Sequence, residues 1–137
     1  MKEGEKMLYD ILVLSVSVVF IGYVLKKIIP GRGIGQITAD ELRKYLDKEN
    51  RNNIQFIDVR HPAKYAEFHI PGFRNIPLKE IKKEAAHLDK DKKVVLICRT
   101  GMQGNEAAKR LKRRGFKDID NVQGGLSTWT PVQLYKK

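Results

Sequence analysis

The most continuous run of apolar positions lies near the start of the chain. Residues 11–25 contain no charge and are apolar all round apart from Ser15 and Ser17. Together with apolar neighbours they span residues 7–29, close to the roughly 20 residues that a helix needs to cross a bilayer. A buried core helix should show a polar face, and a cleaved signal peptide a basic start and a small-residue cleavage site. We therefore expect residues 7–29 to form an uncleaved transmembrane helix.

The charges beside this segment predict its orientation. Lys26, Lys27 and Arg32 follow the apolar run, whereas Lys2 and Lys6 precede it. Because cytoplasmic flanks carry the excess of basic residues, the following domain should face the cytoplasm. Residues 30–35 are rich in helix-breaking proline and glycine and predict a short linker. The chain is thus expected to be a single-pass protein of the cell membrane, with a domain at residues 36–137 held near the membrane surface.

The remaining chain alternates short β-branched runs with helical patterns. Expected strands lie at residues 54–59, 74–76, 94–97 and 118–122, and residues 94–97 should form the central one. Thr38 and Glu41 form a potential capping box before the first helix of the domain. Further helices are expected at residues 62–68, 78–88, 104–114 and 125–129. Strands separated by helices predict an α/β fold with a mostly parallel sheet and helices on both faces.

The charge of the chain is strongly basic, at +11. Most of the excess belongs to residues 36–137, where a basic run at residues 109–114 fills the outer face and last turn of an expected helix. Cations at that position complement the helix dipole, and no aromatic residues interleave with them. We therefore expect a solvated basic face and no specific nucleic-acid partner.

Cys98 is the only cysteine of the chain. A single cysteine excludes an intrachain disulfide and a cysteine-rich metal site, and a lone thiol suits a reducing compartment. His61, His69 and His87 do not have the spacing of metal ligands. We therefore expect neither a metal nor a cofactor.

The position of Cys98 predicts a reactive thiol. It follows the expected central strand and precedes a helix, at the sheet edge where sites form in parallel α/β folds. Free backbone N–H groups and the helix dipole favour a thiolate there and would hold an anion beside it. The alternative is an inert buried cysteine.

Two groups of motifs resemble the signatures of rhodanese-like domains. They extend over about residues 36–130 and comprise Asp58-Val59-Arg60-x-Pro62-x-x-Tyr65-x-x-x-His69-Ile70-Pro71-Gly72-x-x-Asn75-Ile76-Pro77, then Cys98-x-x-Gly101, Ala107-Ala108, Leu111, Gly115-Phe116 and Gly124-Gly125-x-x-x-Trp129. The resemblance implies a mostly parallel five-stranded sheet and sulfurtransferase activity. In that chemistry Cys98 takes a sulfane sulfur, for example from thiosulfate, and passes it to a thiol or another nucleophile. A membrane helix ahead of one such domain is also found in the family.

The resemblance and the local chemistry assign roles to individual residues. The loop after Cys98 should surround the terminal sulfur with backbone N–H groups, those of Arg99, Thr100, Gly101, Met102 and Gln103. The Arg99 side chain could attract an anionic donor or simply point into solvent. Asp58 and Arg60 should hold adjoining loops together, and His69 should be a hydrogen-bonded structural residue. Met102 is expected at the pocket mouth and Trp129 in the core.

Two positions of the loop depart from the family pattern. Many single-domain members carry Arg and then Ser where this chain has Gln103 and Gly104, which bears on substrate preference. In the front motif, Lys64 and Phe68 replace a Glu and a Gly, with small consequences expected.

Two other functions are alternatives to sulfur transfer. A phosphatase or arsenate reductase needs an Arg six residues after the cysteine, where Gly104 stands. A binding module would dock a membrane or sulfur-trafficking partner without turnover. The expected partners of the leading hypothesis are a small sulfur donor, a thiol acceptor and, as one option, a protein acceptor, because no second cysteine can resolve the persulfide.

Overall fold

All strands described in the computed structural model run parallel. The structure describes residues 2–29, 31–47 and 49–130. The strands are β1 (Gly35–Ile37), β2 (Ile54–Asp58), β3 (Arg74–Asn75), β4 (Lys93–Ile97) and β5 (Ile119–Val122). Their order in the sheet is β1-β5-β4-β2-β3. The β-branched run at residues 94–97 thus forms the central strand, as predicted.

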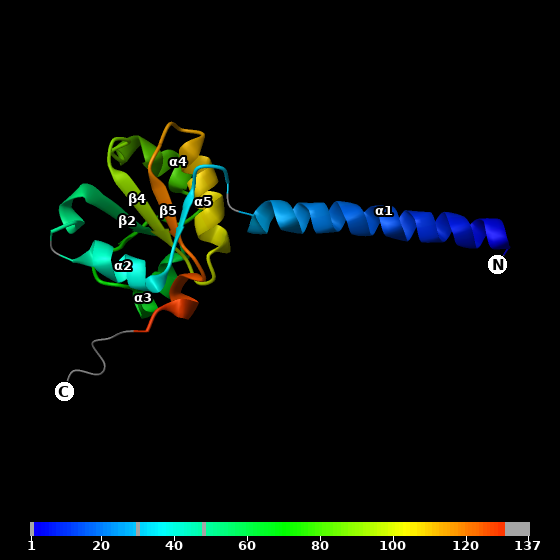
Figure 1. Cartoon of the computed structure of the whole chain (residues 1–137), viewed down its shortest axis with the longest axis horizontal. Helices are drawn as coiled ribbons and strands as arrows, with labels where there is room; N and C mark the ends of the chain where they lie inside the picture. Colours follow the sequence, from blue (N-terminus) through cyan, green and yellow to red (C-terminus); the bar gives the residue numbers. More distant parts are fainter. Residues whose placement is uncertain (1, 30, 48, 131–137) are drawn as a thin grey trace.

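The helices connect successive strands and lie on both sides of the sheet (Figure 1). They are α2 (Ala39–Leu46), α3 (Pro62–Glu67), α4 (Ile81–Glu84) and α5 (Met102–Lys112), with 3-10 turns η1 (Arg51–Asn53), η2 (Ala85–His87) and η3 (Gly125–Thr128). The predicted capping box is present, because Thr38 and Glu41 each accept the other's backbone N–H. The backbone and hydroxyl hydrogen bonds from Thr38 lower the pKa of Glu41.

Alternating side chains of β4 supply two separate cores. Val94 and Leu96 pack toward α4 and α5, whereas Val95 and Ile97 pack toward α2. All four side chains are fully buried. The expected helices on both faces are therefore present, and β4 is covered on each side. This burial explains why its sequence reads as a continuous apolar run rather than an alternating one.

Four elements differ from the sequence-based expectation, and one of them is η3, a 3-10 turn at Gly125–Thr128 where a helix was expected at residues 125–129. The edge strand β1 was not predicted, because three residues with one buried apolar side chain carry little periodicity. The helix expected at residues 78–88 is only α4 followed by the turn η2. Helix α5 begins at Met102 and ends at Lys112 rather than spanning residues 104–114, because Gly101 and Gly115 adopt left-handed conformations at its two ends. Pro30 of the expected linker and residues 131–137 of the expected domain lie outside the described residues.

The N-terminal helix α1 (Glu3–Ile28) extends away from the domain (Figure 1). Its 26 residues correspond to about 39 Å at the usual rise of an α-helix. By length and composition it can cross a membrane, and none of its most apolar part is buried against the rest of the structure. Its C-terminal end contacts α5, where Lys109 Nζ donates to the carbonyl of Lys26 over 2.7 Å.

The turn at Gly125 yields a test of how the cysteine loop is held. Gly125 has a φ of 56°, and a Cβ there would overlap the carbonyl oxygen of Cys98 and lie 2.8 Å from the carbonyl carbon of Arg99. Gly115 has a similar backbone, with a φ of 95°, but a Cβ there would meet nothing closer than the Lys90 side chain at 3.8 Å.

We expect Gly115→Ala to lower the free energy of unfolding by about 1–2 kcal/mol, the cost of a left-handed non-glycine residue. Gly125→Ala should cost a further amount of about 1–3 kcal/mol, because rigid backbone must move. Urea unfolding of the full chain in detergent, followed by Trp129 fluorescence, measures both. Equal losses in the two variants would contradict close packing of Gly125 against the loop.

Candidate active site

The Cys98 side chain lies at the carboxyl end of the central strand, in a loop that leads directly into α5. It is buried, with 1% of its surface exposed. Its Sγ accepts the backbone N–H of Gly101 over 3.0 Å and that of Gly104 over 3.4 Å. Gly101 reaches this position through a left-handed backbone conformation, with a φ of 96°. Two N–H dipoles therefore point at the sulfur and favour negative charge on it.

The hydrogen bonds to Sγ come from two backbone N–H groups. Within the described residues, Sγ accepts hydrogen bonds only from Gly101 and Gly104. The side chains of Arg99, Thr100, Met102 and Gln103 lie at the surface. Gly104 was not among the expected donors, because its role depends on helix α5 beginning at Met102. A start at Met102 places the free N–H of Gly104 in the first turn, near the preceding cysteine.

The backbone of the cysteine loop is tied to the turn η3. Leu126 N–H donates to the carbonyl of Cys98 over 2.8 Å, and Ser127 N–H donates to that of Arg99 over 3.0 Å. These bonds hold the carbonyl groups of Cys98 and Arg99 toward η3.

Asp58 and Arg60 form a buried ion pair beside this edge of the sheet. The guanidinium of Arg60 donates to both carboxylate oxygens of Asp58, the shortest contact being 2.7 Å. It also donates to the carbonyl of Phe68 over 2.6 Å. Asn75 donates to the carbonyls of both Asp58 and Arg60. The pair thus joins the segments that follow β2 and α3, and within the described residues it makes no hydrogen bond to the Cys98 loop.

His69 lies in the segment that joins α3 and β3, and it contacts Tyr65 rather than the sulfur. Its Nδ1 is 2.9 Å from the carbonyl oxygen of Tyr65, and its ring stacks on the Tyr65 ring with centroids 3.8 Å apart. Tyr65 in turn donates its hydroxyl to the carbonyl of Phe73. Trp129 is half-buried against the core, with the Arg43 guanidinium 4.8 Å from its ring.

A cavity of about 250 Å³ adjoins the cysteine loop on its β1 side. It is lined by Met102 and Thr100 of the loop region, by Gln36 and Gln123, and by Ile28 at the end of α1. Met102 and Phe68 are the exposed large apolar side chains of the described domain, at 46% and 48% exposure. The surface beside the loop is therefore partly apolar.

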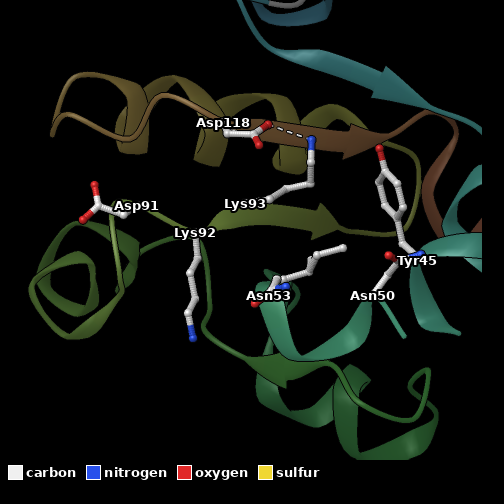
Figure 2. A pocket seen from close by; sticks show the side chains of 8 residues that line it. Tyr45, Asn50, Asn53, Asp91, Lys92, Lys93 and Asp118 are labelled. Atoms are coloured by element: carbon white, nitrogen blue, oxygen red, sulfur yellow. Dashed lines mark hydrogen bonds and ion pairs between the residues drawn. The ribbon is translucent and has the colours of Figure 1, made fainter. Parts of the chain in front are cut away.

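A larger cavity lies at the opposite end of the strands, and Figure 2 shows the side chains that line it. There Lys93 donates to Asp118 over 2.7 Å and to Asp120 over 2.8 Å. Burial alone would lower the pKa of Lys93, but these hydrogen bonds outweigh it and raise the pKa above its ordinary value. Burial, followed by the charge of Asp120, raises the pKa of the adjacent Tyr45. This cluster of Lys93, the two aspartates and Tyr45 joins α2, β4 and β5 at the end of the strands opposite the thiol.

Metal ligands are not gathered in the described part of the chain. Among residues 2–29, 31–47 and 49–130, no three His, Cys, Asp or Glu side chains are placed to hold an ion.

Known proteins resemble this chain in both sequence and fold. It is 32% identical to the Bacillus subtilis protein YqhL over 121 residues, 88% of this chain and 92% of YqhL. It is 35% identical to the putative sulfurtransferase YtwF of the same organism, over 70% of this chain and 90% of YtwF. The putative sulfur carrier protein YrkF, also from Bacillus subtilis, is 35% identical, and the match spans 71% of this chain and about half, 51%, of YrkF.

The fold comparison agrees with the sequence comparison. The crystal structure of a rhodanese-like domain protein from Staphylococcus aureus superposes with a TM-score of 0.65 at 28% identity, covering 72% of this chain and 93% of that one. The profile of the rhodanese-like domain matches residues 38–131. The parallel sheet, the cysteine loop at its edge and these matches together show that the chain belongs to the rhodanese-like domain family, in which relatives are named putative sulfurtransferase and putative sulfur carrier protein.

Proposed function

We propose that this protein is a membrane-anchored sulfurtransferase that carries sulfane sulfur as a persulfide on Cys98. The observation that carries the proposal is the pair of N–H groups, from Gly101 and Gly104, that faces Sγ. Hydrogen bonds to a charged acceptor are stronger than those to a neutral one. The same groups stabilise a thiolate before the reaction and are placed to stabilise the anionic terminal sulfur after it.

The proposed reaction proceeds in two displacement steps. The Cys98 thiolate attacks the outer sulfur of thiosulfate, a new S–S bond forms, and the S–S bond of thiosulfate breaks. Sulfite leaves with the electron pair of the broken bond, and Cys98 becomes an anionic persulfide. An acceptor thiolate then attacks the terminal sulfur, takes it as its own persulfide and restores the Cys98 thiolate. Neither step needs an external oxidant or reductant.

The acceptor in this proposal is a separate molecule. Cys98 is the only cysteine of the chain, so no internal thiol can discharge the persulfide. The partly apolar surface around Met102 beside the loop suits a protein acceptor as well as a small thiol. YrkF is named a putative sulfur carrier protein, which supports transfer of the sulfur to an acceptor molecule.

The proposed anchor is helix α1, with the domain on the cytoplasmic side. None of the apolar part of α1 is buried against the domain, which disfavours a soluble core helix. Lys26 and Lys27 in its last turn are placed to reach the membrane interface. Lys109 donates to the carbonyl of Lys26, and Lys112 donates to that of Arg32, so α5 lies across the end of the anchor (Figure 1). The match to YqhL, which covers 88% of this chain, extends into α1.

Loading of Cys98 tests the chemical part of the proposal. The full chain in detergent is exposed to thiosulfate, inorganic polysulfide or glutathione persulfide. The mass of the peptide that contains Cys98 is then measured by mass spectrometry. We expect the peptide to gain one sulfur atom and to lose it when a thiol is added. Cys98→Ser, the matched control, should gain nothing. If none of the three donors charges Cys98, the catalytic proposal fails and a docking role without turnover is favoured.

Protease protection tests the anchor and its orientation. In bacterial spheroplasts, trypsin added outside should leave the lysine-rich domain intact, whereas inverted vesicles should lose it. Alkaline carbonate should leave the chain in the membrane pellet, because a spanning helix is not released by loss of surface charge. Release by carbonate would contradict the anchor, and digestion from outside would contradict the cytoplasmic orientation.

A further inference from the structure

We propose that Asn121 is a positioning residue that sets the reactivity of Cys98. Its side chain holds the two residues, Gly101 and Gly104, whose N–H groups face Sγ. Asn121 itself makes no hydrogen bond to the sulfur within the described structure. This role of Asn121 is part of the proposed sulfur transfer and rests on that proposal, because the two N–H groups stabilise the anionic sulfur in both steps.

The first contact fixes Gly101. Asn121 is fully buried in β5, and its backbone lies opposite Leu96 of the central strand. Its Nδ2 donates to the carbonyl of Gly101 over 3.1 Å. The same carbonyl accepts the backbone N–H of Asn105 over 3.0 Å. With its carbonyl held at two points, Gly101 stays in the left-handed conformation that turns its own N–H toward Sγ.

The second contact fixes Gly104. The Asn121 Oδ1 occupies the space that a Cβ on Gly104 would need. Gly104 does not have a positive φ, so its backbone conformation does not require glycine. The requirement comes from the close approach of Asn121, which allows the first turn of α5 to lie directly on the amide. Glycine at position 104 and asparagine at position 121 are therefore a matched pair.

A network of three amides fixes the orientation of Asn121. Its Nδ2 is 2.9 Å from Asn105 Oδ1 and 3.2 Å from Gln36 Oε1, and Gln36 Nε2 donates to Asn105 Oδ1 over 2.9 Å. Gln36 and Asn121 lie directly opposite each other on β1 and β5. Three acceptors surround Nδ2, which leaves Oδ1 on the Gly104 side.

The Oδ1 atom of Asn121 makes an unusual contact for a buried polar atom. It is fully buried and has no hydrogen-bond partner among the described residues. An unpaired buried acceptor is unfavourable, and such atoms are rare in native structures. Here the geometry gives the reason, since the atom that lacks a partner is the one against which Gly104 rests.

Alkylation of Cys98 tests this role independently of sulfur transfer. The full chain is treated with iodoacetamide at a series of pH values. We expect Asn121→Ala to slow alkylation about tenfold at pH 7, the scale of one weakened hydrogen bond to a charged group. The difference should narrow as the pH rises, because alkaline conditions favour the thiolate in both proteins. Asn121→Asp keeps the shape but loses the donor to Gly101, and should behave like Asn121→Ala.

A double-mutant cycle tests the matched pair. Gly104→Ala should slow alkylation at pH 7 about tenfold in the parent, because its Cβ would overlap Oδ1. In the Asn121→Ala background the space is open, so the same substitution should have less than a twofold further effect. Contacting residues show such coupling, whereas independent ones add.

Leu42→Ala is the control for loss of stability alone. Leu42 is fully buried in the core on the α2 side of the sheet, away from the amide network. Its variant should unfold more easily and yet keep the parental pH profile of alkylation. Two outcomes would leave Asn121 with a structural role alone. One is the same pH profile in the Asn121 variants and in Leu42→Ala, and the other is an equal effect of Gly104→Ala in both backgrounds. Failure to load sulfur, with these profiles as expected, would instead contradict only the proposed transfer reaction.

Discussion

The structure depends on one electrostatic constraint: a buried sulfur that carries negative charge needs hydrogen-bond donors around it. An ionised group without such donors is strongly disfavoured in a protein interior. Cys98 has 1% of its surface exposed and meets two backbone N–H groups, at 3.0 and 3.4 Å. Backbone donors are suited to this task because the fold sets their direction, so that they need no reorganisation when charge develops on the sulfur.

The parallel sheet makes this arrangement possible. Its central strand, β4, is covered on both faces and ends at Ile97, so the next residue emerges at a well-packed edge. Helix α5 begins only four residues later, at Met102. The turn η3 binds the carbonyl groups of the loop. Asn121 contacts Gly101 of the loop and Gly104 in the first turn of α5. Elements far apart in the sequence thus converge on one loop of a few residues.

Much of this architecture could be predicted from the sequence, because strong local patterns encode it. The β-branched run identified β4, Thr38 and Glu41 identified the start of α2, and the strand–cysteine–helix order placed Cys98 at the sheet edge. Edge strand β1 was missed because a three-residue strand with one buried side chain has no measurable period. The extent of α4 was overestimated because apolar spacing does not show where a helix gives way to a 3-10 turn.

The finer geometry of the site depends on contacts that local patterns do not contain. Gly104 becomes a donor to Sγ only because Gly101 sets the first residue of α5. Asn121 looks in the sequence like an ordinary polar residue of a half-buried strand. Its importance arises from partners 16, 20 and 85 positions away, Asn105, Gly101 and Gln36. Such pairings are determined by the tertiary fold, and glycine at position 104 is understandable only beside them.

The central claim is that Cys98 displaces sulfite from the outer sulfur of a donor and keeps that sulfur. Position-specific isotopic labelling of thiosulfate measures this directly. If the outer sulfur is labelled, the label should appear on Cys98 and then on an added thiol acceptor. If the sulfonate sulfur is labelled, all of the label should leave as sulfite. Label on Cys98 from the sulfonate position, or equal labelling of Cys98→Ser, would contradict the account.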